Sequence, residues 1–156
     1  MQKRMKLLKN QKGMTLVELL AVLVILGIIA AIAIPMIGNV INESRDKALL
    51  SDAQTILNGA NIAYSNEVSN STTFWTKGKS DLEKYVDGID STVDYSVKFK
   101  DGEWYIYYAG LTGIKTEKFA VAKDGYITAD NLKKLLKGQS VDENNDIDKD
   151  KYDKIN

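Results

Sequence analysis

Glu18 is the residue of this sequence whose position most needs a chemical explanation. It stands directly before an apolar run, Leu19 to Ile37, that contains no polar side chain. A charge near the centre of a bilayer costs about 2.5–3.5 kcal/mol on insertion scales, so a chain bound for lipid normally keeps charges out of such a run. Glu18 therefore needs either a water-exposed place at the membrane edge or a cationic partner.

Two of the commonest catalytic side chains are missing from the sequence. It contains no histidine and no cysteine, which removes the commonest general base, the usual nucleophile pairs, the commonest metal ligand and any disulfide. A carboxylate-only active site stays formally open, but no pair of acids indicates one. We therefore expect a protein that is not an enzyme and that needs no cofactor.

The charges balance overall, with 21 basic and 21 acidic residues, but they are unevenly placed. Five basic residues precede Gly13, in a region without an acid: Lys3, Arg4, Lys6, Lys9 and Lys12. The rest of the chain is mildly acidic. This balance argues against a nucleic-acid partner and against electrostatic adhesion to anionic lipid, because both need a positive surface.

The apolar run has the length of a membrane span. As a helix, Leu19 to Ile37 would measure about 29 Å, close to the thickness of the hydrocarbon core. A core helix of a small soluble domain would alternate polar and apolar faces, and this one does not. Because the basic residues lie on its amino-terminal side, the positive-inside rule places Met1 in the cytoplasm and the rest of the chain outside.

The segment "KGMTLVELL" (residues 12–20) resembles the class III leader of type IV prepilins and the related pseudopilins, and the resemblance covers about the first 40 residues. Met14 departs from the Phe that family members most often have after the glycine. The resemblance implies that a prepilin peptidase cuts after Gly13 and methylates the new amino terminus, Met14. It also implies partners: other copies of this chain, other pilins, an assembly ATPase and a membrane platform protein.

Cleavage after Gly13 would give Glu18 a cationic partner. The new amine of Met14 lies four residues before Glu18, on the same side of the helix. When such helices stack with a stagger, Glu18 of one copy can meet the Met14 amine of a neighbour, and this pairing selects one register. The alternative is that Glu18 reaches to the cytoplasmic interface of the membrane.

Gly27 and Pro35 interrupt the apolar helix. Pro35 removes a backbone donor and crowds the carbonyl group of Ala31, and Gly27 lowers helix propensity by nearly 1 kcal/mol relative to Ala. Both residues are frequent in membrane helices, so they need no special role. The resemblance to pilins implies the sharper interpretation, a helix that partly unwinds between them in a filament.

The fold class that we expect is α+β, with a long amino-terminal helix packed against a small antiparallel sheet. The helix spans membrane in its first half, is amphipathic in its second half and runs from about Met14 to Asn66. A loop at 69–74 follows the long helix, and a capping box at 80–83 opens a short helix. We expect strands at 93–99, 104–108 and 117–122, with turns at 100–103 and 123–125 and a short fourth strand after the second turn. A last helix is expected at 129–137, capped by Thr128. Trp104, Ile106 and Tyr108 share one strand face, which packing against the helix explains better than sugar or DNA binding.

The expected organisation has four segments: a leader (1–13), a membrane or filament-core helix (14–37), a globular domain that includes the second half of the helix (38–140) and an acidic tail (141–156). On the exposed half of the helix, an apolar stripe includes Ile41 and Ala48, and Asp46 is placed on the opposite, polar side.

The acidic tail offers the ligand chemistry of a calcium loop. Its candidate ligands are Asp142, Asn144, Asp146, Asp148, Asp150 and Asp153. Ile147 stands where such a loop needs glycine, and Asp153 is shorter than the usual glutamate. The alternative is a solvated, disordered acidic end.

These observations together favour a structural subunit of a type IV pilus, located first in the cytoplasmic membrane and then at the cell surface. A minor pilin and a competence or secretion pseudopilin are alternatives within the same family. From another class, the alternative is an uncut, single-span membrane protein whose outer domain binds a ligand.

Overall fold

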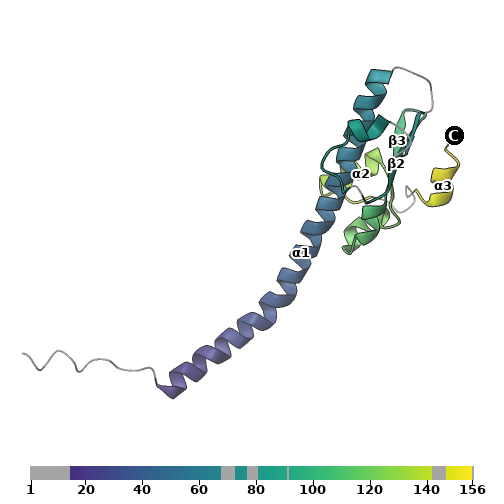
Figure 1. Ribbon diagram of the computed structural model, residues 1–156. Helices are drawn as coiled ribbons and strands as arrows, with labels where there is room; N and C mark the ends of the chain where they lie inside the picture. Colours follow the sequence, from purple (N-terminus) through teal and green to yellow (C-terminus); the bar gives the residue numbers. More distant parts are fainter. Residues whose placement is uncertain (1–14, 68–72, 77–80, 91, 142–146, 156) are drawn as a thin grey trace, which may run out of the picture. The chain divides into compact units, whose positions relative to one another are not determined.

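The computed structural model describes residues 15–67, 73–76, 81–90, 92–141 and 147–155 (Figure 1). By its internal contacts the chain divides into two compact units, Met1–Gly38 and Asn39–Asn156. Helix α1 (Leu16–Glu67) begins in the first unit and ends in the second. The predicted long helix is therefore confirmed, and so is the α+β class, because the second unit contains a four-stranded antiparallel sheet.

The sheet is a meander in which each strand pairs with the next one along the chain. Its strands are β1 (Thr73–Thr76), β2 (Tyr95–Lys100), β3 (Glu103–Tyr108) and β4 (Tyr126–Thr128). The other elements are the 3-10 helices η1 (Asp81–Lys84), η2 (Ala109–Gly113) and η3 (Glu117–Ala122) and the helices α2 (Ala129–Leu136) and α3 (Lys149–Asp153).

The β2–β3 hairpin closes at the turn that the sequence predicts. Lys100 pairs with Glu103, so Asp101 and Gly102 form a two-residue loop, with φ of 51° and 83°. Positive φ at both positions is the geometry that suits the right-handed twist of a hairpin, and Asp-Gly is a preferred pair for it. This turn fixes the register and thereby the face to which each side chain of β3 points.

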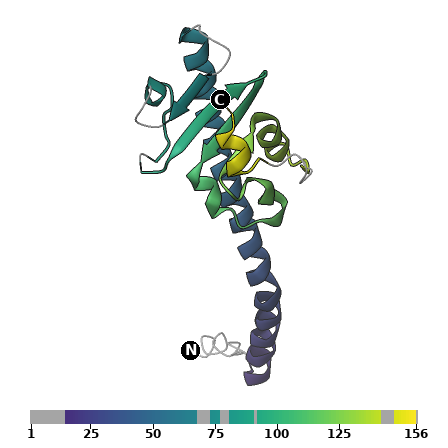
Figure 2. The same ribbon diagram turned by 90° about the vertical axis from the view of Figure 1, so that its right-hand side faces the viewer.

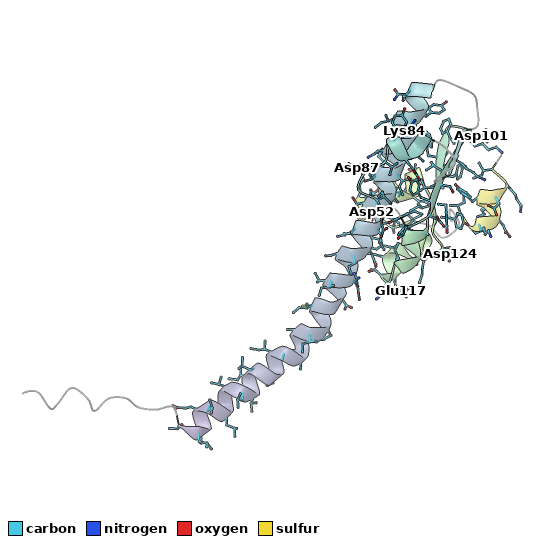
Figure 3. The ribbon with its side chains drawn as sticks, in the orientation of Figure 1. Asp52, Lys84, Asp87, Asp101, Glu117 and Asp124 are labelled. Atoms are coloured by element: carbon cyan, nitrogen blue, oxygen red, sulfur yellow. The ribbon has the colours of Figure 1, made fainter. Side chains whose placement is uncertain are left out.

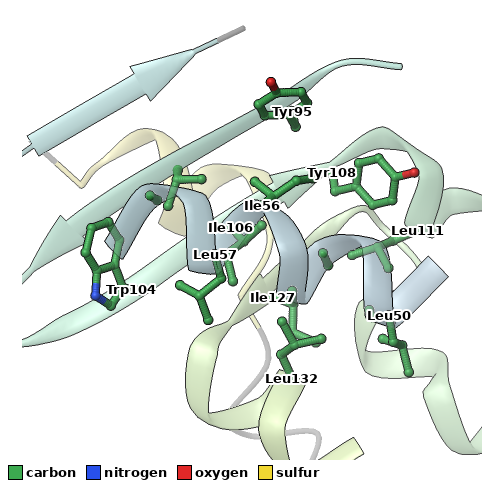
Figure 4. Close-up of a cluster of buried hydrophobic side chains, with 14 of the residues drawn as sticks. Leu50, Ile56, Leu57, Tyr95, Trp104, Ile106, Tyr108, Leu111, Ile127 and Leu132 are labelled. Atoms are coloured by element: carbon green, nitrogen blue, oxygen red, sulfur yellow. The ribbon is translucent and has the colours of Figure 1, made fainter. Parts of the chain in front are cut away.

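The core of the second unit lies between the sheet and the second half of α1 (Figure 4). Trp104, Ile106 and Tyr108 alternate with half-buried residues along β3 and are buried against the helix, as predicted. Tyr64 of α1 meets the Trp104 ring edge-on, with 5.7 Å between ring centroids. The α1 residues that complete the core are Leu50, Ala53, Ile56, Leu57, Ala60 and Ala63.

The predicted stripe on this half of α1 is wrong at its start. Ile41 and Ala48 are exposed, whereas Asp46, assigned to the polar side, is 2% exposed. The buried stripe runs through Asp46, Leu50 and Ala53 at four- and three-residue spacing, so the charge of Asp46 concealed the true face.

Asp46 is buried because it binds the backbone of the segment between η2 and η3. Its Oδ2 atom accepts hydrogen bonds from the backbone N–H groups of Lys115 (3.1 Å) and Thr116 (2.7 Å). Burial alone would raise the pKa of Asp46, but these hydrogen bonds outweigh it and the net shift of the pKa is downward. The ionised carboxylate thus holds the η2–η3 connection against α1.

Two predicted elements near the sheet are wrong. Residues 117–122, predicted as a strand, form η3, in which Phe119 and Ala122 are buried at the three-residue spacing of a 3-10 helix. The segment 69–74, predicted as a loop, ends in β1, which pairs with β2 from Thr73↔Phe99 to Thr76↔Ser96. Residues 69–72 of that segment lie outside the described residues.

Local capping signals are confirmed at α2. The Thr128 hydroxyl accepts a hydrogen bond from the backbone N–H of Asn131, and Gly138 follows the helix with φ of 75°. At the predicted capping box of residues 80–83, the structure has the 3-10 helix η1, and Ser80 lies outside the described residues.

The described end of the chain, residues 147–155, packs on the face of the sheet opposite α1. Figures 1 and 2 show α3 and the second half of α1 on opposite sides of β2 and β3. Tyr152 is 4% exposed, and its hydroxyl lies 2.7 Å from the Ser96 hydroxyl of β2. The Lys98 ammonium donates to the backbone carbonyl of Tyr152 (2.9 Å). This face of the sheet is therefore covered by the chain's own carboxyl-terminal segment.

Candidate functional site

The first turn of α1 contains a reciprocal pair of hydrogen bonds around Glu18. The Thr15 backbone N–H donates to Glu18 Oε2 (2.8 Å), and the Glu18 backbone N–H donates to Thr15 Oγ1 (3.3 Å). The backbone N–H of Leu19 donates to the Thr15 carbonyl (3.1 Å), which makes Thr15 the residue that caps the helix. This arrangement is a capping box, and it satisfies two backbone donors that the helix itself cannot satisfy.

The capping box gives Glu18 a role that neither sequence interpretation included. The signal was present, because Thr15 and Glu18 have the T-x-x-E spacing of the motif. The bond to Thr15 uses one oxygen of an exposed carboxylate that has about four acceptor positions. Glu18 can therefore cap its own helix and still accept a further donor.

Glu18 is surrounded by apolar surface along the first unit. It is the only charged residue between Leu16 and Gly38. The large apolar side chains of this part of α1 are between 45% (Val22) and 80% (Leu16) exposed. Contiguous apolar surface of this extent is typical of membrane or protein contacts, because water cannot solvate it favourably. The chain itself does not cover it in the part that the structure describes.

Gly27 and Pro35 both lie inside the continuous helix α1. A Cβ atom added to Gly27 would have no neighbour within 4 Å, so no packing within the described chain requires a glycine there. Pro35 leaves the helix unbroken in a single copy. Unwinding between these residues on assembly remains a prediction.

One comparison with known proteins decides the identity of this region. A family model described as the prokaryotic N-terminal methylation motif matches residues 8–34. This match supports the class III prepilin leader that the sequence predicts in this part of the chain. No solved structure matches the chain at a significant level. The matched residues include Gly13 and Met14, the predicted cleavage and methylation positions, which themselves lie outside the described residues.

The pilin-like leader and the structure agree on a membrane-anchored precursor. The first part of α1 is long and apolar enough to cross a membrane, the one described helix of which this is true. The motif implies processing by a prepilin peptidase and assembly with pilins.

The predicted calcium ligands remain untested as a set. Asp142, Asn144 and Asp146 lie outside the described residues. Asp148 accepts a hydrogen bond from the backbone N–H of Lys151 (2.8 Å) and caps α3, while Asp150 and Asp153 belong to that helix. Among the described residues, no three acids lie close enough together to hold a metal ion.

Proposed function

We propose that this pilin-like chain is a structural subunit of a type IV pilus and that it catalyses no reaction. The observation that carries the proposal is the exposed apolar surface of α1 from Leu16 to Ile37, with Glu18 as its single charge. In the precursor, lipid covers this surface. In the filament, other copies of the same helix cover it, so polymerisation exchanges one apolar environment for another.

Removal of the leader precedes this move of the helix from lipid into the filament. A prepilin peptidase cuts after Gly13 and methylates Met14, and the mature chain divides into a filament-core helix (14–37), an exposed domain (38–140) and an acidic tail (141–156). The cut leaves the peptide bond between Met14 and Thr15 intact, so the capping box at Glu18 persists in the mature protein. An assembly ATPase, acting through a membrane platform protein, and other pilins complete the set of partners.

Glu18 sets the register of the filament in this proposal. Its capping bond to Thr15 holds the carboxylate at the start of the helix, and its remaining acceptor positions receive the methylated amine of a neighbouring copy. The Glu18 carboxylate and the Met14 amine are both charged in an apolar environment. Every register that leaves them unpaired therefore has a higher free energy.

Two substitutions separate the capping function of Glu18 from its charge. Glu18→Gln keeps a side chain that serves a capping box but removes the charge. Thr15→Ala removes the hydroxyl half of the box and keeps the charge. We expect Glu18→Gln to lower the yield of surface filaments at least tenfold by electron microscopy, and Thr15→Ala to reduce it far less. Equal yields in wild type and Glu18→Gln, with normal export of both chains, would contradict charge-selected register.

A minor pilin or a pseudopilin would use the same α1 surface, and the composition of isolated filaments distinguishes these roles. We propose the major role, because the acidic balance outside the leader suits a chain that does not itself contact DNA. A filament in which this chain is the dominant protein supports that choice. A filament in which it is a trace component assigns it to the minor class.

A further inference from the structure

We propose that the second unit binds an aliphatic polyamine in a pocket beside a row of tyrosine rings. The pocket has a volume of about 560 Å³ and is lined by Tyr107, Asp124, Tyr126, Asp148, Lys149 and Asp150. The lining residues come from β3, the turn before β4, β4 itself and the start of α3. This site lies on the sheet face opposite the second half of α1, within the second unit (Figure 1).

The aromatic floor of the pocket is fixed by the register of the sheet. Tyr107 and Tyr126 are directly opposed on β3 and β4, with 4.7 Å between ring centroids. Gly125 keeps the space for this pair, since a Cβ atom there would lie 3.0 Å from the Tyr107 ring, and its φ of 86° also disfavours a side chain. Both tyrosines remain half-buried, so part of each ring is open to solvent.

The same row of rings already holds a cation of this chain at its buried end. Tyr126 also contacts Tyr152, with 5.1 Å between ring centroids, so the row continues under α3. The Lys98 ammonium lies 4.6 Å from the centre of the Tyr152 ring, within the range of a cation–π interaction. An ammonium group at the open end would meet the same kind of aromatic surface.

The charged lining residues indicate a positive ligand. The lining contains three carboxylates, those of Asp124, Asp148 and Asp150, and one ammonium group, that of Lys149. One Asp148 oxygen accepts the Lys151 backbone N–H, which holds this carboxylate in place and leaves the other oxygen available. The balance of the lining therefore favours a cation over an anion.

The spacing of the carboxylates distinguishes between kinds of cation. A calcium ion needs six to eight oxygen ligands at 2.3–2.6 Å, which requires acids that converge on one point. Among the described residues no three acids converge in this way. A flexible chain with several separated ammonium groups needs no such convergence, because it can place one group on the rings and others at different carboxylates.

The test is a titration of the full chain with spermidine in a non-ionic polyoxyethylene detergent, which offers neither a charged headgroup nor a sugar. Isothermal titration calorimetry gives the affinity, and the ring resonances of the tyrosines give the location. We expect saturable binding that weakens with added salt, about fivefold weaker binding for Tyr107→Leu and about threefold weaker binding for Asp124→Asn.

Asp87→Asn is the matched control. Asp87 and Asp124 are both exposed, and Figure 3 shows them on different sides of the second unit. We expect the Asp87→Asn variant to bind spermidine with the affinity of the wild type. Absence of saturable binding, an equal loss in Asp87→Asn, or binding of calcium or N-acetylglucosamine but not of spermidine would overturn the proposal. The titration involves neither leader cleavage nor filaments, so its failure would leave the proposed pilus role untouched.

Discussion

The two halves of α1 have the same backbone conformation and opposite relations to the rest of the chain. From Leu16 to Ile37 the large apolar side chains are exposed, and Leu23 is 60% exposed. From Asp46 to Ala63 one stripe is buried, and Leu50 is 0% exposed. In a soluble helix the buried half would be expected to carry more apolar residues, but here the more apolar half is the exposed one.

This difference shows that the second half is completed by its own chain and the first half is not. Leu50 and its neighbours gain stability by removing apolar surface from water within one molecule. The large apolar side chains of the first half stay exposed in the described residues, and in the proposed function lipid or other copies of the chain supply their contacts. The stability of one half and the assembly of the other are therefore separable by mutation.

The largest effect on stability is expected when the same substitution is made in each half. Leu50→Ala should lower the free energy of unfolding of the second unit by about 3 kcal/mol, because it leaves a cavity in a fully buried site. Leu23→Ala should leave that free energy unchanged within about 0.5 kcal/mol. Urea unfolding of both variants in detergent, followed by tryptophan fluorescence, measures the contrast. Equal losses would show that the two halves form one cooperative core.

A smaller effect is expected at Asp46, the charged residue of the buried stripe. Asp46→Ala should cost about 2 kcal/mol, since it leaves the backbone N–H groups of Lys115 and Thr116 without their acceptor.

The pH dependence sharpens this prediction. The pKa of Asp46 is lowered from its ordinary value of 3.8, so its contribution is fully present above about pH 4 and is lost as the pH falls through the lowered value. The free energy of unfolding, measured from unfolding curves at pH 6 and pH 3, should fall less between these two pH values for Asp46→Ala than for the wild type. An unchanged difference would contradict the assigned role of this carboxylate.

The smallest effect is expected at the start of the helix. Thr15→Ala should destabilise the first turn of α1 by about 1 kcal/mol, because the cap is lost, and should leave the unfolding of the second unit unchanged. Amide hydrogen exchange measures both quantities in one experiment. Faster exchange throughout the second unit would show that the cap influences more than its own turn.

The parts of the fold that follow local rules were predictable from the sequence. Gly13 and the apolar run predicted the leader and the span, Asp101 and Gly102 predicted the hairpin turn, and Thr128 predicted the cap of α2. Each of these signals acts within a few residues, so no knowledge of the tertiary structure is needed to interpret it.

The failures concern contacts between residues far apart in the sequence. Asp46 looks like a surface residue until the backbone of Lys115 and Thr116 arrives to bind it. Phe119 belongs to a segment with strand-like composition, but β4 already pairs with β3 where a further strand would lie. The cover provided by Tyr152 depends on Ser96 and Lys98 of β2, which no periodicity of the tail reveals.

The capping box was a different kind of omission. Thr15 and Glu18 have the T-x-x-E spacing of the motif, so this local role of Glu18 was predictable from the sequence alone. Its local role and its proposed assembly role are compatible, because they use different acceptor positions of one carboxylate.

The central claim, a pilin subunit that leaves the membrane after its leader is removed, is tested most directly by mass spectrometry of the intact chain isolated from the cell surface. We expect an amino terminus at Met14 carrying one methyl group, with residues 1–13 absent. A chain that still begins at Met1 and remains a monomer in the cell envelope would contradict it.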